Sequence, residues 1–263
     1  MEIMSPHIPL FVRLQNQGQP SILLRTQYRC HPNIAQVANY LFYENYLKDG
    51  VKEEQRKRLL QRFPPITFIS AEKGYESKSE FSYRNYYEAK FIVAFLDYLT
   101  TLIYHKFNGI PFKDPNKGSD SDSSNEEEKN FLDQEPDDAE GSIGVILTYR
   151  SQVELVKQLI LESPNRAMHD VQVSTVDAFQ GAEKDIIVLG TVRTRSLGFI
   201  EDCRRLNVAI TRARRHLIVI GKETLLRKNT HWRYIIDQSK SKEQKLMGYK
   251  KVETFYKMGG LFK

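Results

Sequence analysis

Short runs of continuous apolar residues recur along the chain, and segments with helical periodicity separate several of them. These runs lie at residues 66–69, 143–147, 171–174, 185–190 and 217–220. Strands that are apolar throughout are typical of a parallel sheet buried on both faces, because helices make the connections between its strands. The alternation therefore predicts an α/β fold in which helices cover both faces of a parallel sheet.

Most of the predicted helices have an apolar stripe at three-to-four-residue spacing or a clear start signal, whereas the segment 51–63 is charged and is stopped by Pro64-Pro65. They cover residues 32–43, 51–63, 85–104 and 151–162. Pro32 suits the first helical position, and Ser151 with Glu154 has the spacing of a capping box. We also expect a short strand at residues 21–24.

The charge is unevenly distributed along the chain. The net charge is +6, but residues 113–141 hold eleven acidic residues and three lysines, so the rest of the chain carries +14. This acidic stretch has too few apolar residues to fold, and the strand pattern resumes directly after it. We therefore expect a disordered insert within one domain at 21–238, with an irregular segment at 1–20 and a basic, frayed tail at 239–263. The basic surplus suits a polyanionic partner or a merely soluble surface equally well.

Cysteine content and hydropathy narrow the class of protein. Cys30 and Cys203 do not have metal-ligand spacing, so we expect free thiols in a reducing compartment and no metal bound by this chain alone. No apolar run approaches the length of a membrane span, and we see no signal-peptide pattern. We expect a soluble, intracellular protein with no membrane partner.

Three short motifs carry side chains suited to nucleotide chemistry. They are Gln27-Tyr-Arg-Cys-His-Pro32, Asp177-Ala-Phe-Gln-Gly-Ala-Glu-Lys-Asp185 and Asn207-Val-Ala-Ile-Thr-Arg-Ala-Arg214. An aromatic residue beside an arginine, as at Tyr28 and Arg29, can stack on a base and contact a phosphate. Gly181 lets the backbone approach a ligand closely, and Arg212 precedes an apolar strand. Each motif alone also has a structural explanation.

A phosphate-binding loop is absent from the sequence. No Gly-x-x-x-x-Gly-Lys-Ser/Thr occurs, and no apolar strand ends in an acidic pair that could hold magnesium. We therefore expect the isolated chain to be inactive, and the phosphate and Mg²⁺ sites to lie on a domain outside this sequence.

Together the motifs resemble the C-terminal, RecA-like motor domain of superfamily 1 helicases of the up-frameshift-like group, and more narrowly the GRF-type zinc-finger 5′–3′ DNA helicases. The resemblance implies ATP and Mg²⁺ as cofactors. It implies that Tyr28 stacks on adenine, that Arg29 and Arg212 contact the γ-phosphate as catalytic residues, and that Gly181 and Glu183 face the nucleotide. Cys30 departs from the methionine usual in that family, which is an exchange of soft apolar side chains.

A second set of residues follows predicted strands and suits a sugar-phosphate backbone. These candidates for nucleic-acid binding are Thr148, Tyr149, Arg150, Ser174 and Thr175. In the related helicases, the corresponding elements line a single-stranded track. The resemblance implies single-stranded nucleic acid as a partner, DNA rather than RNA, and a preceding RecA-like domain as a second partner. It also implies 5′–3′ movement, a role in DNA repair and nuclear location.

Three other functions fit the same sequence. The chain could be a non-catalytic nucleic-acid-binding module without a motor, an interaction domain that docks on another helicase half, or part of an RNA helicase. The helicase motor domain is favoured over these three alternatives because the nucleotide-facing motifs are intact.

Overall fold

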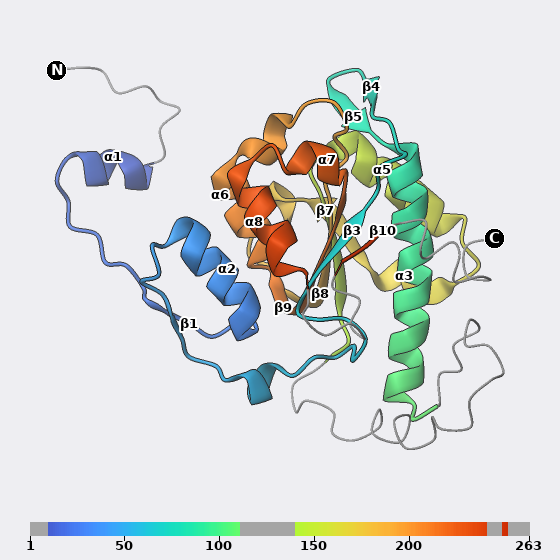
Figure 1. Ribbon diagram of the computed structural model, residues 1–263, viewed down its shortest axis with the longest axis horizontal. Coiled ribbons are helices and arrows are strands. Elements are labelled where there is room, and N and C mark those ends of the chain that lie inside the picture. The colour runs from blue at the N-terminus through green and yellow to red at the C-terminus, as the bar shows by residue number, and fades with distance from the viewer. Residues whose placement is uncertain (1–9, 111–139, 241–248, 252–263) are drawn as a thin grey trace.

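The computed structural model describes residues 10–110, 140–240 and 249–251, and a parallel sheet forms its centre (Figure 1). The strand order is β10-β3-β9-β8-β6-β7, and every neighbouring pair is parallel. The strands are β3 (Ile66–Ser70), β6 (Ile143–Leu147), β7 (Gln172–Thr175), β8 (Lys184–Gly190), β9 (Ala213–Gly221) and β10 (Tyr249–Lys251). This architecture confirms the predicted RecA-like α/β class.

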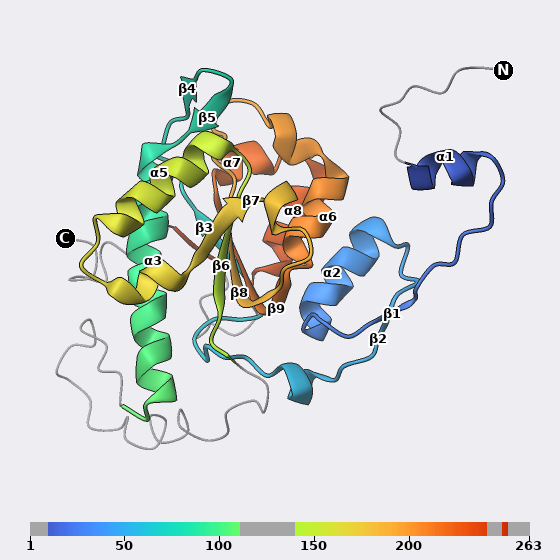
Figure 2. The same cartoon turned by 180° about the vertical axis from the view of Figure 1, so that it is seen from behind.

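Helices cover both faces of the sheet, as Figures 1 and 2 show from opposite sides. One face carries α3 (Tyr86–Phe107) and α5 (Arg150–Leu161), and the other carries α2 (Pro32–Phe42), α6 (Cys203–Ile210) and α8 (Thr230–Gln238). The short α7 (Glu223–Leu226) follows β9. The predicted helices at 32–43 and 85–104 are therefore confirmed to within a few residues of their ends.

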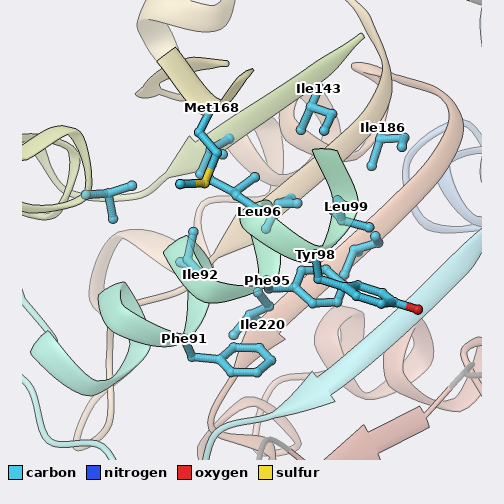
Figure 3. Packing of buried hydrophobic residues seen from close by; sticks show 14 of the residues in the cluster. Phe91, Ile92, Phe95, Leu96, Tyr98, Leu99, Ile143, Met168, Ile186 and Ile220 are labelled. Carbon is cyan, nitrogen blue, oxygen red and sulfur yellow. The ribbon is translucent and has the colours of Figure 1, made fainter. Parts of the chain in front are cut away.

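The core under α3 is rich in aromatic side chains (Figure 3). The ring of Phe95 lies 5.9 Å from Phe63 in an edge-to-face arrangement and 5.8 Å from Phe91 in a stacked one. Such pairs contribute beyond the burial of their area. The pair of Phe63 and Phe95 joins α3 to the segment that leads into β3.

Two predicted elements near the N-terminal end are wrong. Residues 21–24 are exposed and form no strand; the first strand is β1 (Thr26–Gln27), which pairs with β2 (Lys48–Asp49) outside the main sheet. Within 51–63 only a 3₁₀ turn, Glu53–Arg56, is helical. The remaining chain is irregular, yet it carries Leu59, Leu60 and Phe63 into the core.

The ends of the chain also differ from expectation. The segment expected to be irregular contains α1 (Leu10–Asn16), which has no buried residues and stands apart from the sheet in both views. Within the segment expected to fray, Tyr249–Lys251 pairs with β3 as the edge strand β10. Almost all of the acidic insert at 113–141 lies outside the described residues.

The start of α5 does not use the predicted capping box. The helix begins at Arg150 with Tyr149 at the N-cap, so Ser151 lies inside the first turn. The backbone N–H of Ser151 donates instead to the hydroxyl of Ser82, at 3.2 Å. Ser82 belongs to a hairpin formed by β4 (Ser77–Ser79) and β5 (Ser82–Arg84). Tyr149 cannot cap with its side chain, and the hairpin supplies the acceptor.

A buried carboxyl makes stability depend on pH. Both oxygens of Glu88 accept from the N–H of Val192 at 3.0 Å, and burial raises the pKa of Glu88 to about 8. The folded protein therefore keeps a proton that the unfolded chain releases above its ordinary carboxyl pKa, so this group lowers stability as pH rises from about 4.5 to 8.

Glu88→Gln should remove this dependence, because the amide stays neutral. Urea unfolding from pH 5 to 8.5 measures the free energy of unfolding of both proteins. As pH rises, this free energy should increase in the variant relative to the wild type by on the order of a few kcal/mol. Buried His216, whose pKa burial lowers to about 3, makes stability fall as pH drops below about 6.5 in both proteins, so only their difference is informative. Glu154→Gln, on the exposed face of α5, is the matched control. If the free energy of unfolding depends on pH in the same way in the wild type and in Glu88→Gln, the raised pKa of Glu88 is contradicted.

Candidate nucleotide and nucleic-acid sites

The predicted site residues fall into two groups at opposite edges of the sheet. Glu183 and Arg212 directly precede β8 and β9, so they lie at the amino-terminal edge. Thr148 directly follows β6, and Thr175 ends β7, so they lie at the carboxyl-terminal edge. A strand as long as β8 separates two such edges by about 20 Å. The structure therefore builds two sites rather than one.

Arg212 is positioned by the end of α6. That helix ends at Ile210, and the side chain of Arg212 turns back so that its Nε donates to the carbonyl of Val208 at 3.1 Å. A second nitrogen donates to the carbonyl of Ala182 at 3.4 Å. Carbonyls at a helix C-terminus favour a cation. The guanidinium is thus fixed between the helix end and the turn that leads into β8.

Arg29 reaches the same place from a distant part of the sequence. Its Nε donates to a carboxylate oxygen of Glu183 in an ion pair, and its NH1 donates to the carbonyl of Thr211 at 3.2 Å. The side chains are 34% and 41% exposed, so the pair is open to solvent on one side. Residues that are 154 positions apart therefore share one ion pair beside Arg212.

The cluster has an excess of positive charge. Within the described ranges, Arg29 and Arg212 share the carboxylate of Glu183 as a neighbour, and Arg214 Nε lies 3.9 Å from Glu183 Oε1. Burial, and then the neighbouring charge of Arg29, lower the pKa of Arg212. A bound anion would offset this repulsion. Planar guanidinium groups are well suited to phosphate oxygens, so the arrangement can hold a phosphoryl group.

Tyr28 and Gly181 flank the arginine cluster. The ring of Tyr28 is 65% exposed and lies over Gly50, where a Cβ atom would come within 2.2 Å of the ring. Arg56 donates to the carbonyls of Tyr28 and Arg29, at 3.0 and 2.9 Å, and so fixes this segment. Gly181 has a φ of +89° and open space where a side chain would be, as a close backbone approach requires.

Three neighbours of the cluster have structural positions. Cys30 is buried, and its thiol donates to the carbonyl of Thr211 at 3.5 Å; burial raises its pKa to about 12, so it stays protonated. Asp185 and Arg215 are both fully buried and form an ion pair at 3.1 Å. Asp185 is thus a structural partner of Arg215.

The carboxyl-terminal edge presents only part of the predicted nucleic-acid set. Thr148 and Thr175 line a pocket of about 240 Å³, and Ser174 is half-buried beside it in β7. Arg150 is 85% exposed and pairs with Glu154. Tyr149 is buried, and its hydroxyl accepts from Arg193 at 2.8 Å. Tyr149 therefore positions Arg193. Its buried side chain does not face a bound nucleic-acid strand, contrary to expectation.

Sequence reasoning missed the residues that surround Tyr149. Arg193 forms a buried ion pair with Glu76 at 3.0 Å, and its guanidinium lies 4.1 Å from the ring centre of Tyr83. This network ties the β4–β5 hairpin to the loop after β8. The run Thr191-Val-Arg-Thr-Arg195 at a strand end was a usable indication for Arg193. Phe199 and Arg205, which border the pocket, had no periodic pattern to reveal them.

Two kinds of feature are absent from the described part of the chain. Among residues 10–110, 140–240 and 249–251, no helix is long and apolar enough to cross a membrane. Over the same ranges, no group of three or more His, Cys, Asp or Glu side chains is arranged to hold a metal ion.

Comparison with known proteins identifies the family of the chain. A family model described as an AAA domain matches residues 7–224. The 5′-3′ DNA helicase ZGRF1 of Mus musculus is 37% identical over 239 residues, which cover 90% of this chain and 11% of that protein. Helicase SEN1 of Saccharomyces cerevisiae is 30% identical, covering 89% and 10%. The ATP-dependent helicase MJ0104 of Methanocaldococcus jannaschii is 33% identical, covering 89% and 32%.

Among solved structures, the C-terminal domain of a possible DNA helicase from a Lactobacillus matches with a TM-score of 0.41 and 10% identity, over 86% of this chain and 99% of that one. The chain spans only about a tenth to a third of the length of the three helicases named above. The family model, in contrast, covers most of it. The chain therefore belongs to the AAA-domain family, and it is similar to part of each of the three helicases named above.

Proposed function

We propose that this chain is the second motor domain of an ATP-dependent DNA helicase. The observation that carries the proposal is the cluster of Arg29, Glu183 and Arg212, which has surplus positive charge and lies open at one edge of the sheet. In this role the chain does not bind the nucleotide alone. It closes over ATP that is held, with Mg²⁺, by a preceding RecA-like domain.

Each residue of the cluster has a distinct task in this proposal. Tyr28 stacks on the adenine, and Arg29 contacts the γ-phosphate while Glu183 orients its guanidinium. Arg212 stabilises the charge that spreads over the phosphoryl oxygens during transfer. Gly181 allows the backbone to approach the nucleotide. The exposed ring of Tyr28 and the fixed side chain of Arg212 support these assignments.

The second site would hold the nucleic acid. Thr148, Ser174 and Thr175 end neighbouring strands on the side opposite the arginine cluster, and Arg150 lies exposed next to them. Closing and opening of two domains around ATP would then move this edge along a single strand. Similarity to the mouse 5′-3′ DNA helicase supports DNA as the substrate and 5′–3′ movement. The GRF-type motifs also support a nuclear protein that acts in DNA repair.

The isolated chain should show no steady ATP hydrolysis, because the sequence lacks a phosphate-binding loop and magnesium-binding carboxylates. A turnover assay on purified chain, with and without single-stranded DNA, checks this expectation. Hydrolysis that Arg212→Ala abolishes would contradict the two-domain proposal, because it would show a complete site within this chain.

The same preparation distinguishes the competing functions. Single-stranded DNA should bind weakly, and the logarithm of affinity should fall with the logarithm of salt concentration by slightly less than one unit per phosphate contacted. A flat salt dependence would exclude a track along the sugar-phosphate backbone. A clear preference for RNA of the same length would favour an RNA helicase instead.

A further inference from the structure

The pocket at the carboxyl-terminal edge has walls of contrasting chemistry. Its interior is apolar, with Leu189 from β8 and Ala209 from α6. Thr148 and Thr175 bring hydroxyl groups to one wall. Phe199 also lines the pocket, with 57% of its surface exposed although it is a large aromatic residue. A flat, amphipathic ligand with polar edges would match these walls.

The exposed ring of Phe199 is held in place by its neighbours. The guanidinium of Arg205 lies 5.3 Å from the ring centre, and two nitrogens of Arg205 donate to the carboxylate of Asp177, each at 3.2 Å. The ring centre of Phe199 lies 5.6 Å from that of Tyr149, and the two rings are tilted by 51°. The ring is thus oriented before any ligand binds, which lowers the entropy cost of binding against it.

The two threonine hydroxyls have hydrogen-bonding capacity left. Thr148 Oγ1 donates to the carbonyl of Thr191 at 3.1 Å and can still accept. Thr175 Oγ1 accepts from the N–H of Ala178 at 3.4 Å and can still donate. Together they offer one acceptor and one donor, which can be satisfied by the edge of a nucleobase.

We propose that this pocket takes up one nucleobase of the bound single strand, stacked on Phe199 with its edge against Thr148 and Thr175. The inference rests on the proposed nucleic-acid function and adds to it, because backbone contacts alone need no apolar pocket. Single-stranded nucleic acid exposes bases that can stack on aromatic side chains, whereas a duplex keeps them paired. The pocket would therefore favour single strands over duplexes.

The chain carries its own reporter for this site. Trp232 is the only tryptophan of the sequence, and its ring lines the pocket while its Nε1 donates to the carbonyl of Ile200 at 2.8 Å. A base that enters the pocket should alter the fluorescence of Trp232. Strands that bind only through phosphates should leave it unchanged.

The test is a titration of the full chain with an oligothymidylate and with an abasic oligonucleotide of equal length and charge. We expect the oligothymidylate to bind roughly 5- to 100-fold more tightly, by the usual effect of stacking one base on an aromatic side chain, and only it to alter the emission of Trp232. Thymidine monophosphate is a third arm, and its binding with equal affinity would assign the pocket to free nucleotides and overturn the proposal.

Phe199→Ala tests the stacking partner. It should bring the affinity for oligothymidylate down to that for the abasic strand and remove the response of Trp232, while circular dichroism confirms the fold. Phe81→Ala is the matched control, because Phe81 is fully exposed at the hairpin and does not line the pocket. The Phe81→Ala variant should keep the fluorescence response of Trp232.

The outcomes separate this inference from the function on which it rests. If base-bearing and abasic strands bind equally with the same salt dependence, the backbone track stands and the base pocket is wrong. If neither strand binds, the nucleic-acid function of the domain fails as well.

Discussion

Replacing Arg212 with alanine in a full-length helicase that carries this domain should lower the maximal rate of ATP turnover by about a thousandfold or more. The structure fixes this guanidinium through two backbone carbonyls and surrounds it with other positive charge. A group held in this way interacts most strongly with the negative charge of the transferring phosphoryl group, which is spread most widely in the transition state. The Michaelis constant should change far less.

Two further variants separate the roles within the cluster. Arg212→Lys should restore little activity, because the compact ammonium group of lysine cannot replace a planar guanidinium with several hydrogen-bond donors. Tyr28→Ala should raise the Michaelis constant and keep most of the maximal rate, since stacking holds ground state and transition state alike. If Arg212→Ala raises only the Michaelis constant, Arg212 binds the ground state and Arg29 becomes the candidate for the catalytic arginine.

Breaking the ion pair of Asp185 and Arg215 should destabilise the fold by about 3–5 kcal/mol, because both side chains have no exposed surface. Asp185→Asn keeps the shape and leaves the guanidinium of Arg215 without its full counter-charge. Asp185 also accepts from the backbone N–H groups of Glu140 and Ser142, at 3.0 and 3.3 Å, so the chain that leads into β6 should loosen too. Urea unfolding at neutral pH measures the loss.

A surface pair supplies the control for this experiment. Glu154→Ala removes the partner of Arg150 on the exposed face of α5 and should cost less than about 1 kcal/mol. Removing both buried charges with apolar residues of similar volume should recover part of the stability lost by Asp185→Asn. Equal and small losses at the buried and exposed pairs would mean that water reaches the buried pair.

The sheet and its main helices could be predicted because their residues are placed by local pattern. Each buried strand reads as an apolar run, and β6 matches its predicted limits of 143–147. The region 51–63 could not be predicted, since its apolar residues meet the core in an irregular path that only tertiary packing stabilises. The pairing of β1 with β2 is equally invisible, because each strand has only two residues.

For the candidate sites, residue identities were available from the motifs but their arrangement was not. Nothing in the sequence indicates that Arg29 pairs with Glu183, because that contact depends on how α2 packs beside β9. Likewise, Tyr149 reads as a strand-end residue, yet the folded chain buries it against Arg193. Long-range packing therefore decides which of the predicted site residues stay exposed and which become buried.

The most direct test of the central claim compares two nucleotide complexes of the full-length helicase. The account predicts that Arg212→Ala weakens binding of ADP with aluminium fluoride, which mimics the transferring phosphoryl group, by about a thousandfold. Binding of a non-hydrolysable ATP analogue should weaken less than about tenfold in the same variant. Equal losses for both nucleotides, or no loss for either, would contradict a role for Arg212 in stabilising the transition state.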